Sequence, residues 1–74
     1  MPQTVEHDFP PRITTAARAG VERALAGEQA TIIDRLYAYE IQEAGRRLAS
    51  ADGLSDAVQI TATADRVSFT LIGS

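Results

Sequence analysis

The 74-residue sequence contains no cysteine, lysine, asparagine or tryptophan, and its one histidine is His7. Without cysteine there can be no disulfide, thiolate nucleophile or metal site with cysteine ligands. Without lysine there can be no Schiff base, P-loop lysine or Ser–Lys dyad. One histidine excludes a multi-histidine zinc site within a single chain. We therefore predict no metal, no cofactor and no catalytic residue in this chain.

The charged residues are all arginine, aspartate and glutamate, and the formal net charge is −3. A negative chain is poorly suited to non-specific binding of nucleic acid. The all-arginine basic set and the many alanines indicate a GC-rich coding bias, which is an inference about the genome and not about function. No run approaches the roughly 18 apolar residues of a membrane span, and no signal segment opens the sequence. We expect a cytoplasmic protein that does not contact a membrane.

The length predicts one small domain whose stability is marginal. A domain of this size buries only about 60% of the surface of its unfolded chain, so it usually needs a cross-link or a second subunit. Because no disulfide is possible here, we predict a homo-oligomer, with a dimer as the simplest form.

The longest helical pattern covers residues 28–51, where the apolar positions follow a period of 3.6. One stripe, expected to face the core, consists of Ala30, Ile33, Tyr37, Ile41, Ala44 and Leu48. A second apolar group lies on another side of the first half of this helix and consists of Ile32, Leu36 and Tyr39. The preceding helix or another molecule has to cover that second group. Gly53 is the expected left-handed residue that ends the helix.

Residues 1–12 are predicted to form an extended arm, because Pro10 and Pro11 disfavour helix just before themselves. The rest of the chain, 13–74, would then form the domain. Phe9 is expected either to pack in a groove of its own domain or to cross to a neighbouring subunit.

A first helix is predicted from about Ala16 to Ala26, with Thr14 or Thr15 as its N-cap. Its apolar side is made of mostly small residues, which are Ile13, Ala17, Gly20, Val21, Ala24 and Leu25. Small residues let another element approach closely, and the second apolar group of residues 28–51 is the expected neighbour. Gly27 is predicted to end the helix. The alternative is one continuous helix, since a glycine inside a helix costs only about 1 kcal/mol.

After a loop over residues 52–56 the hydrophobic period changes from 3.6 to 2, which predicts a β-hairpin. Placing Ala64 opposite Val67 puts every apolar side chain of both strands on one face, with a turn at Asp65 and Arg66. A loop of two or four residues gives this arrangement. We therefore predict an α+β fold: an extended arm, one long or two consecutive helices, and a two-stranded antiparallel hairpin packed on the second helix.

The predicted hairpin has a threonine-rich outer face, and its strands carry no charge outside the turn. Neither edge therefore has the lysine, proline or inward charge that usually prevents pairing with another strand. We expect an edge to pair with the hairpin of a second subunit, with the arm at residues 3–9, or with a strand of a partner protein.

Few residues suggest chemistry of their own. Glu6, His7 and Asp8 are interpreted as a solvated part of the arm, and Glu40 and Glu43 as a solvated helix face. Removal of Met1 would leave a secondary amine at residue 2. In that N-terminal proline, in its size and in its extended–helix–hairpin order, the chain resembles the tautomerase superfamily.

That resemblance implies a small oligomeric enzyme with Pro2 as its base, which is the first alternative function. A nucleic-acid-binding regulator is the second. The prediction we favour is a non-enzymatic protein–protein interaction or assembly module, a small accessory or structural subunit of a bacterial or phage complex. Its predicted interface residues are Phe9, Ile32, Leu36, Tyr39, Thr61 and Thr70.

Overall fold

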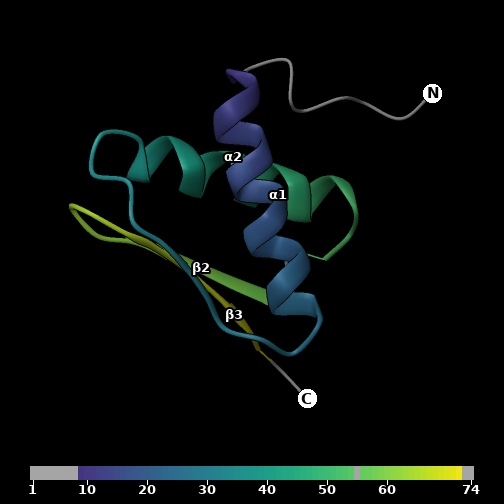
Figure 1. Cartoon of the computed structure of the whole chain (residues 1–74). Helices are drawn as coiled ribbons and strands as arrows, with labels where there is room; N and C mark the ends of the chain where they lie inside the picture. The colour runs from purple at the N-terminus through teal and green to yellow at the C-terminus, as the bar shows by residue number, and fades with distance from the viewer. Residues whose placement is uncertain (1–8, 55, 73–74) are drawn as a thin grey trace.

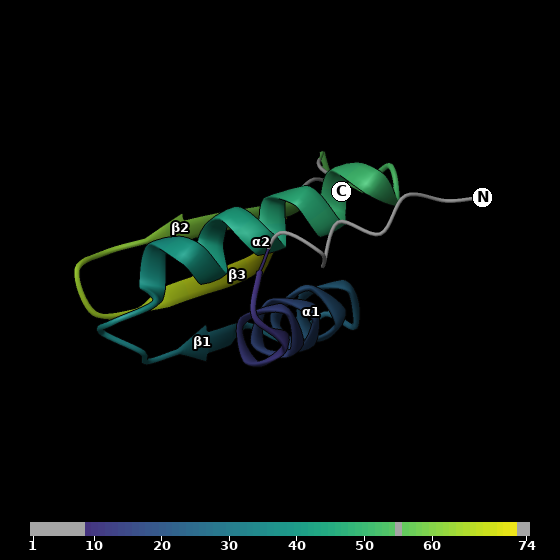
Figure 2. The ribbon, with the colours of Figure 1, turned by 90° about the horizontal axis from the view of Figure 1, so that it is seen from above.

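Two helices cover one face of a three-stranded antiparallel sheet (Figures 1 and 2). The computed structural model describes residues 9–54 and 56–72. The elements in chain order are α1 (Pro11–Leu25), β1 (Ala30–Ile32), α2 (Ala38–Ala51), β2 (Val58–Ala62) and β3 (Val67–Leu71). The strand order is β1-β3-β2, so the last strand is the central one. The predicted α+β class is confirmed, and the sheet has one strand more than the predicted hairpin.

The first helix begins earlier than predicted, at Pro11 with Pro10 as the N-cap. Proline is favoured at the first helical position, where its missing N–H has no helical partner to lose and its φ already suits a helix. Thr14 therefore lies inside the helix, where it is buried and its hydroxyl donates to the Pro10 carbonyl at 3.4 Å. The predicted threonine N-cap and the predicted start at Ala16 are wrong.

Both helices end at a glycine, as the sequence predicts. Gly27 has φ +87° and Gly53 has φ +71°. After each glycine a backbone N–H returns to the last turn, from Glu28 to the Arg23 carbonyl at 3.0 Å and from Leu54 to the Ala49 carbonyl at 2.7 Å. This hydrogen bond across a glycine of positive φ is typical of the Schellman motif, which therefore ends both helices. The chain therefore has two separate helices, and the continuous-helix alternative is wrong.

Residues 28–37 are not helical, so the predicted helix over 28–51 is wrong in its first part. Ala30–Ile32 forms β1 and pairs with β3, with Ala30 opposite Phe69 and Ile32 opposite Val67. Residues 31–33 are three β-branched residues in succession, whose restricted χ1 angles suit a strand better than a helix. This short strand occupies the edge of β3 that the sequence left open.

A turn connects β1 to α2. The Tyr37 N–H donates to the carbonyl and to the carboxylate of Asp34, both at 3.3 Å. Side-chain bonds of this kind stabilise turns at the expense of helix. The helix starts only at Ala38 and ends at Ala51, as predicted for its C-terminal end.

The predicted hairpin is present, with a loop of four residues, 63–66, between β2 and β3. Ala62 lies opposite Val67 and Ile60 opposite Phe69. The even loop length is confirmed, but the predicted pairing of Ala64 with Val67 is wrong by two residues. The longer loop is closed by a bond from the Thr63 N–H to the Arg66 carbonyl at 2.9 Å and needs no residue with positive φ. A two-residue turn would have required one at Arg66.

The core is centred on Phe69, which is fully buried between the two helices. A Cβ atom on Gly20 of α1 would lie 2.4 Å from a carbon of the Phe69 ring, and one on Gly45 of α2 would lie 2.9 Å from it. The two glycines therefore let both helices pack directly on this ring from the same side of the sheet. The expected contact between α1 and the group Ile32, Leu36 and Tyr39 is wrong for Leu36 and Tyr39, which are exposed. Ile32 packs against the core, and α1 contacts β1 as well as α2 and β3.

Candidate interaction surfaces

The connection between β1 and α2, together with the first turn of α2, exposes three large apolar side chains within residues 33–39. Ile33 and Leu36 are each 77% exposed, and Tyr39 is 61% exposed. Ile33 was predicted to face the core, and that prediction is wrong because the chain leaves the sheet after Ile32 (the teal loop in Figure 1). We call Ile33, Leu36 and Tyr39 the 33–39 surface.

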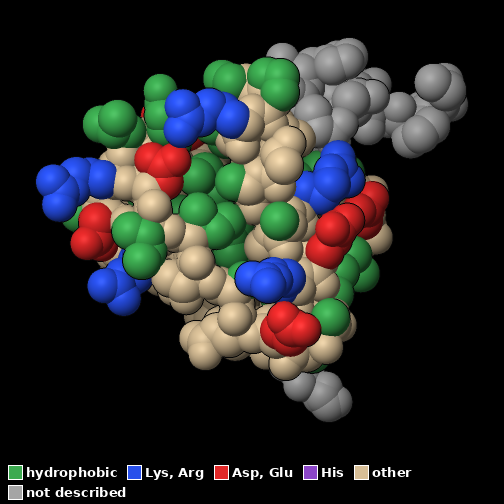
Figure 3. All heavy atoms as spheres, viewed as in Figure 1, with side chains coloured by type: hydrophobic (Ala, Val, Ile, Leu, Met, Phe, Trp, Pro, Cys, Tyr) green, Lys and Arg blue, Asp and Glu red, His purple; other side chains and the backbone are tan. Residues whose placement is uncertain are grey.

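Contacts with the start of α1 anchor this connection. The Arg12 guanidinium lies 4.9 Å from the centre of the Tyr37 ring, and its Nη2 is 3.8 Å from Oδ2 of Asp34. The Tyr37 ring also packs against the hydrophobic core. The exposed side chains therefore extend from a backbone held at both of its ends, by β1 on one side and by these contacts on the other. In Figure 3, hydrophobic side chains also reach the surface among acidic and basic ones.

A second surface is the outer edge of β2, which has no strand partner in the part of the chain that the structure describes. Ala57 and Thr63 flank β2, and both make backbone hydrogen bonds to the β3 side of the hairpin, at 2.8 and 2.9 Å. Backbone groups alternate between the two edges of a strand, so the odd-numbered residues face β3. The residues whose N–H and C=O groups face away from β3 are Val58, Ile60 and Ala62.

Two side chains of α2 lie over that edge. The Gln42 amide donates from Nε2 to the Ile60 carbonyl at 3.4 Å. With the amide turned the other way, its oxygen accepts from the Ala62 N–H at 3.3 Å and from Nη2 of Arg46 at 3.2 Å. The second orientation makes two bonds in place of one. Either orientation satisfies part of the free edge, which is one way in which proteins protect exposed strands.

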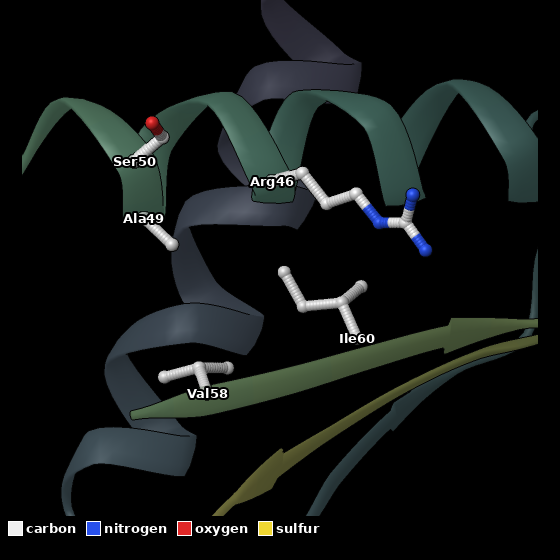
Figure 4. Close-up of a pocket in the computed structure, with 5 residues that line it drawn as sticks. All are labelled: Arg46, Ala49, Ser50, Val58 and Ile60. Carbon is white, nitrogen blue, oxygen red and sulfur yellow. The ribbon is translucent and has the colours of Figure 1, made fainter. Parts of the chain in front are cut away.

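Beside this edge lies a hollow of about 320 Å³ between α2 and β2. Its lining residues are Arg46, Ala49, Ser50, Val58 and Ile60. Figure 4 shows Val58 and Ile60 pointing from the strand toward the helix, and Ala49 pointing back toward the strand. The Arg46 side chain extends along the hollow, so the lining is mostly apolar, with one cationic group and the polar residue Ser50.

The face of the sheet away from the helices is uncharged and rich in hydroxyl groups. Thr31, Ser68 and Thr61 lie opposite one another across the three strands, and Thr70 lies opposite Gln59. The threonine-rich outer face predicted for the hairpin is therefore present, and it continues onto β1.

The predicted interface residues lie at different places. Leu36 and Tyr39 belong to the 33–39 surface. Thr61 and Thr70 lie on the hydroxyl-rich face, Thr61 exposed and Thr70 half-buried. Ile32 packs against the core of its own chain from β1. Their role in an interface stays a prediction.

Phe9 also packs against the core of its own chain. The Arg47 guanidinium lies 5.0 Å from the centre of its ring. Of the two placements that the sequence left open for Phe9, the structure shows the one within its own domain.

The candidates for chemistry add little. Pro2, Glu6, His7 and Asp8 lie outside the described residues. Glu40 and Glu43 are exposed on α2. Among the described residues, no three acidic or histidine side chains come together as metal ligands. No described helix combines the length and hydrophobicity that crossing a membrane requires.

Sequence reasoning missed three residues of these surfaces: Ile33, Gln42 and Arg46. For Ile33 the signal was present, because residues 31–33 are three consecutive β-branched residues directly before an aspartate, a combination typical of a strand that ends in a turn. Gln42 and Arg46 stand four apart on a helix, but nothing in the sequence shows that this pair lies over a strand edge.

Comparisons with protein families, with curated proteins and with solved structures find no match to this chain.

Proposed function

We propose that this chain is a non-enzymatic interaction and assembly module that associates with itself through the 33–39 surface. The observation that carries the proposal is the exposure of Ile33, Leu36 and Tyr39, three large apolar side chains, on an anchored connection. Single exposed apolar side chains are normal on protein surfaces, whereas a group of large ones in one short segment is a candidate interaction site.

The free energy gained by burying the 33–39 surface favours a contact in which both partners contribute apolar side chains. Full burial of one large apolar side chain contributes about 1.5–3 kcal/mol, so the exposed parts of these three contribute about 3–6 kcal/mol together. Association costs about 4–15 kcal/mol in lost freedom, so one copy of the surface against a polar partner binds weakly. A two-fold contact buries the same surface on both chains and doubles the apolar term to about 6–12 kcal/mol.

The neighbouring residues fit an interface rim. Arg12 and Arg35 are exposed beside the apolar group, and Asp34 is partly exposed. Arginine and tyrosine are enriched in interfaces, where their apolar parts pack and their polar ends stay in contact with water. A 74-residue chain without a disulfide also gains stability from a second copy.

The variant Leu36→Glu tests this surface. We expect it to remain folded, because the side chain is 77% exposed, and to weaken self-association at least tenfold, because it would bury a carboxylate in the contact. Sedimentation velocity over a range of concentrations measures the effect. The matched control is Ala19→Glu, which adds the same charge at an exposed position of α1 and should leave association unchanged. Equal association of Leu36→Glu and wild type would rule out the 33–39 surface.

A further inference from the structure

We propose that the outer edge of β2 receives a short extended segment of a partner protein, added to the sheet as a fourth strand. The segment carries an aliphatic residue and an acidic residue two positions apart. This inference rests on the proposed function in treating the chain as an interaction module, but it uses a different surface and a different partner.

The backbone of β2 offers the first requirement for strand addition, which is a row of donors and acceptors that no described strand pairs with. Val58, Ile60 and Ala62 direct these groups away from β3. The strand carries no charge and no proline, so nothing in its own sequence repels or blocks an incoming strand. Main-chain bonds to such an edge supply affinity, and pockets for alternate side chains supply specificity.

The hollow between α2 and β2 offers the second requirement, a place for an alternate side chain. Successive side chains of a strand point to opposite faces, so every second residue of an added strand would point to the helix side. At the Val58 end of the edge, that side chain meets Ala49 and Val58, which are both buried and apolar. An aliphatic side chain of the partner fits this end.

Arg46 places a positive charge at the other end of the hollow. Its guanidinium extends past Ile60 (Figure 4) and comes close enough to Gln42, at the Ala62 end, to donate to its amide oxygen. Residues two apart in a strand are separated by roughly 6.6 Å, the same step as from Val58 to Ile60. A partner residue two positions from the aliphatic one therefore lies under this cation, and a carboxylate there forms a charge-assisted bond.

The same arginine argues against a second copy of this chain at the edge. The strand β2 itself, Val58–Ala62, contains no acidic residue. A second copy of β2 at this edge would therefore offer no carboxylate to Arg46. The complementary occupant is a different, acidic segment, and self-pairing of the hairpin becomes one outcome of the test.

The Gln42 side chain covers part of the β2 edge through hydrogen bonds that an incoming strand can replace. Its amide occupies either the Ile60 carbonyl or the Ala62 N–H, and an incoming strand has to displace it. Because a hydrogen bond at a partly exposed site is weak, we expect Gln42→Ala to tighten binding of the segment by about two- to tenfold.

The test is a titration of the isotope-labelled full chain followed by NMR. The probes are two short capped threonine peptides, one with valine followed two positions later by glutamate, the other with the reverse order. The two orders distinguish parallel from antiparallel addition. We expect one of them to shift the amide signals of Val58, Ile60 and Ala62 in a saturable way, with a Kd on the order of 0.1–1 mM.

A double-mutant cycle tests the charge pair. Replacing the glutamate of the peptide by glutamine, or making Arg46→Gln in the protein, should each weaken binding about three- to fivefold, and both changes together should weaken it no further. Arg46 is exposed, so the substitution should leave the fold intact.

Three results would overturn the proposal. They are the absence of saturable shifts with both probes, equal binding of the glutamate and glutamine peptides, and signals at the edge that change with protein concentration alone, which would show self-pairing. None of these depends on the 33–39 surface. A loss of self-association in Leu36→Glu with intact peptide binding would support both proposals, and a monomeric wild type that binds the peptide would leave only this one.

Discussion

Replacing Phe69 with alanine is expected to remove a large part of the stability of the fold. The ring is fully buried and is the shared contact of both helices with the sheet. Deleting a buried phenylalanine typically costs about 3–5 kcal/mol. The whole domain, at about 0.05–0.15 kcal/mol per residue, has about 4–11 kcal/mol of stability. The change therefore removes a large part of the total, and urea unfolding followed by circular dichroism measures it.

The matched control for Phe69→Ala is Leu71→Ala, two positions along the same strand. Leu71 is 46% exposed, so its replacement should cost about 1 kcal/mol or less. Similar losses for the two variants would contradict the central position of Phe69 in the core.

Gly20→Ala is expected to destabilise the protein by about 1–3 kcal/mol. The helix propensity alone predicts the opposite sign, because alanine is favoured over glycine inside a helix by about 1 kcal/mol. The added Cβ would lie 2.4 Å from the buried Phe69 ring, so α1 or the ring has to move. Overpacking of this kind costs about 1–3 kcal/mol and occasionally more, and here the overlap is with a fully buried ring. Thermal unfolding in the same buffer as wild type measures the change.

Two further variants separate overpacking from other effects of Gly20→Ala. Ala19→Gly, at the neighbouring exposed position, should lose about 1 kcal/mol through propensity alone. Combining Gly20→Ala with Phe69→Leu should cost less than the sum of the two single changes, because the smaller side chain makes room for the methyl group. A stabilised Gly20→Ala variant would show that α1 does not pack on Phe69 through this glycine.

The parts of the fold that the sequence predicts well are those with one consistent pattern. Residues 58–62 and 67–71 alternate strictly, and only one face can then be apolar, so the hairpin and its even loop length follow. The register does not follow from the sequence, because a loop of two residues and a loop of four residues both keep the apolar side chains on one face of the hairpin. Gly27 and Gly53 mark the helix ends because few other residues adopt positive φ at low cost.

The strand β1 was not predictable from the helical wheel. Ile33, Tyr37 and Ile41 are four apart and fit a helical stripe, although only Ile41 lies in a helix. A three-residue strand is too short to show a period of its own, and pairing with β3 decides its conformation. The same error concealed the exposure of Ile33, since the wheel assigned it to the core.

The candidate surfaces were predictable only in part, because the sequence pattern identifies uncovered apolar residues but does not give the order of the strands. Leu36 and Tyr39 were identified as apolar residues that the hairpin does not cover, and they are exposed. The covered edge of β3 and the free edge of β2 depend on strand order, which no local pattern gives. The position of Gln42 and Arg46 over that free edge depends on how α2 crosses the sheet.

Self-association of this interaction module is measured most directly as the mass of the wild-type chain at micromolar concentration by light scattering. One chain has a mass of 7.9 kDa. We expect at least twice that mass for wild type, and a mass closer to that of one chain for Leu36→Glu. A well-folded wild-type protein that stays at 7.9 kDa would contradict self-association through the 33–39 surface.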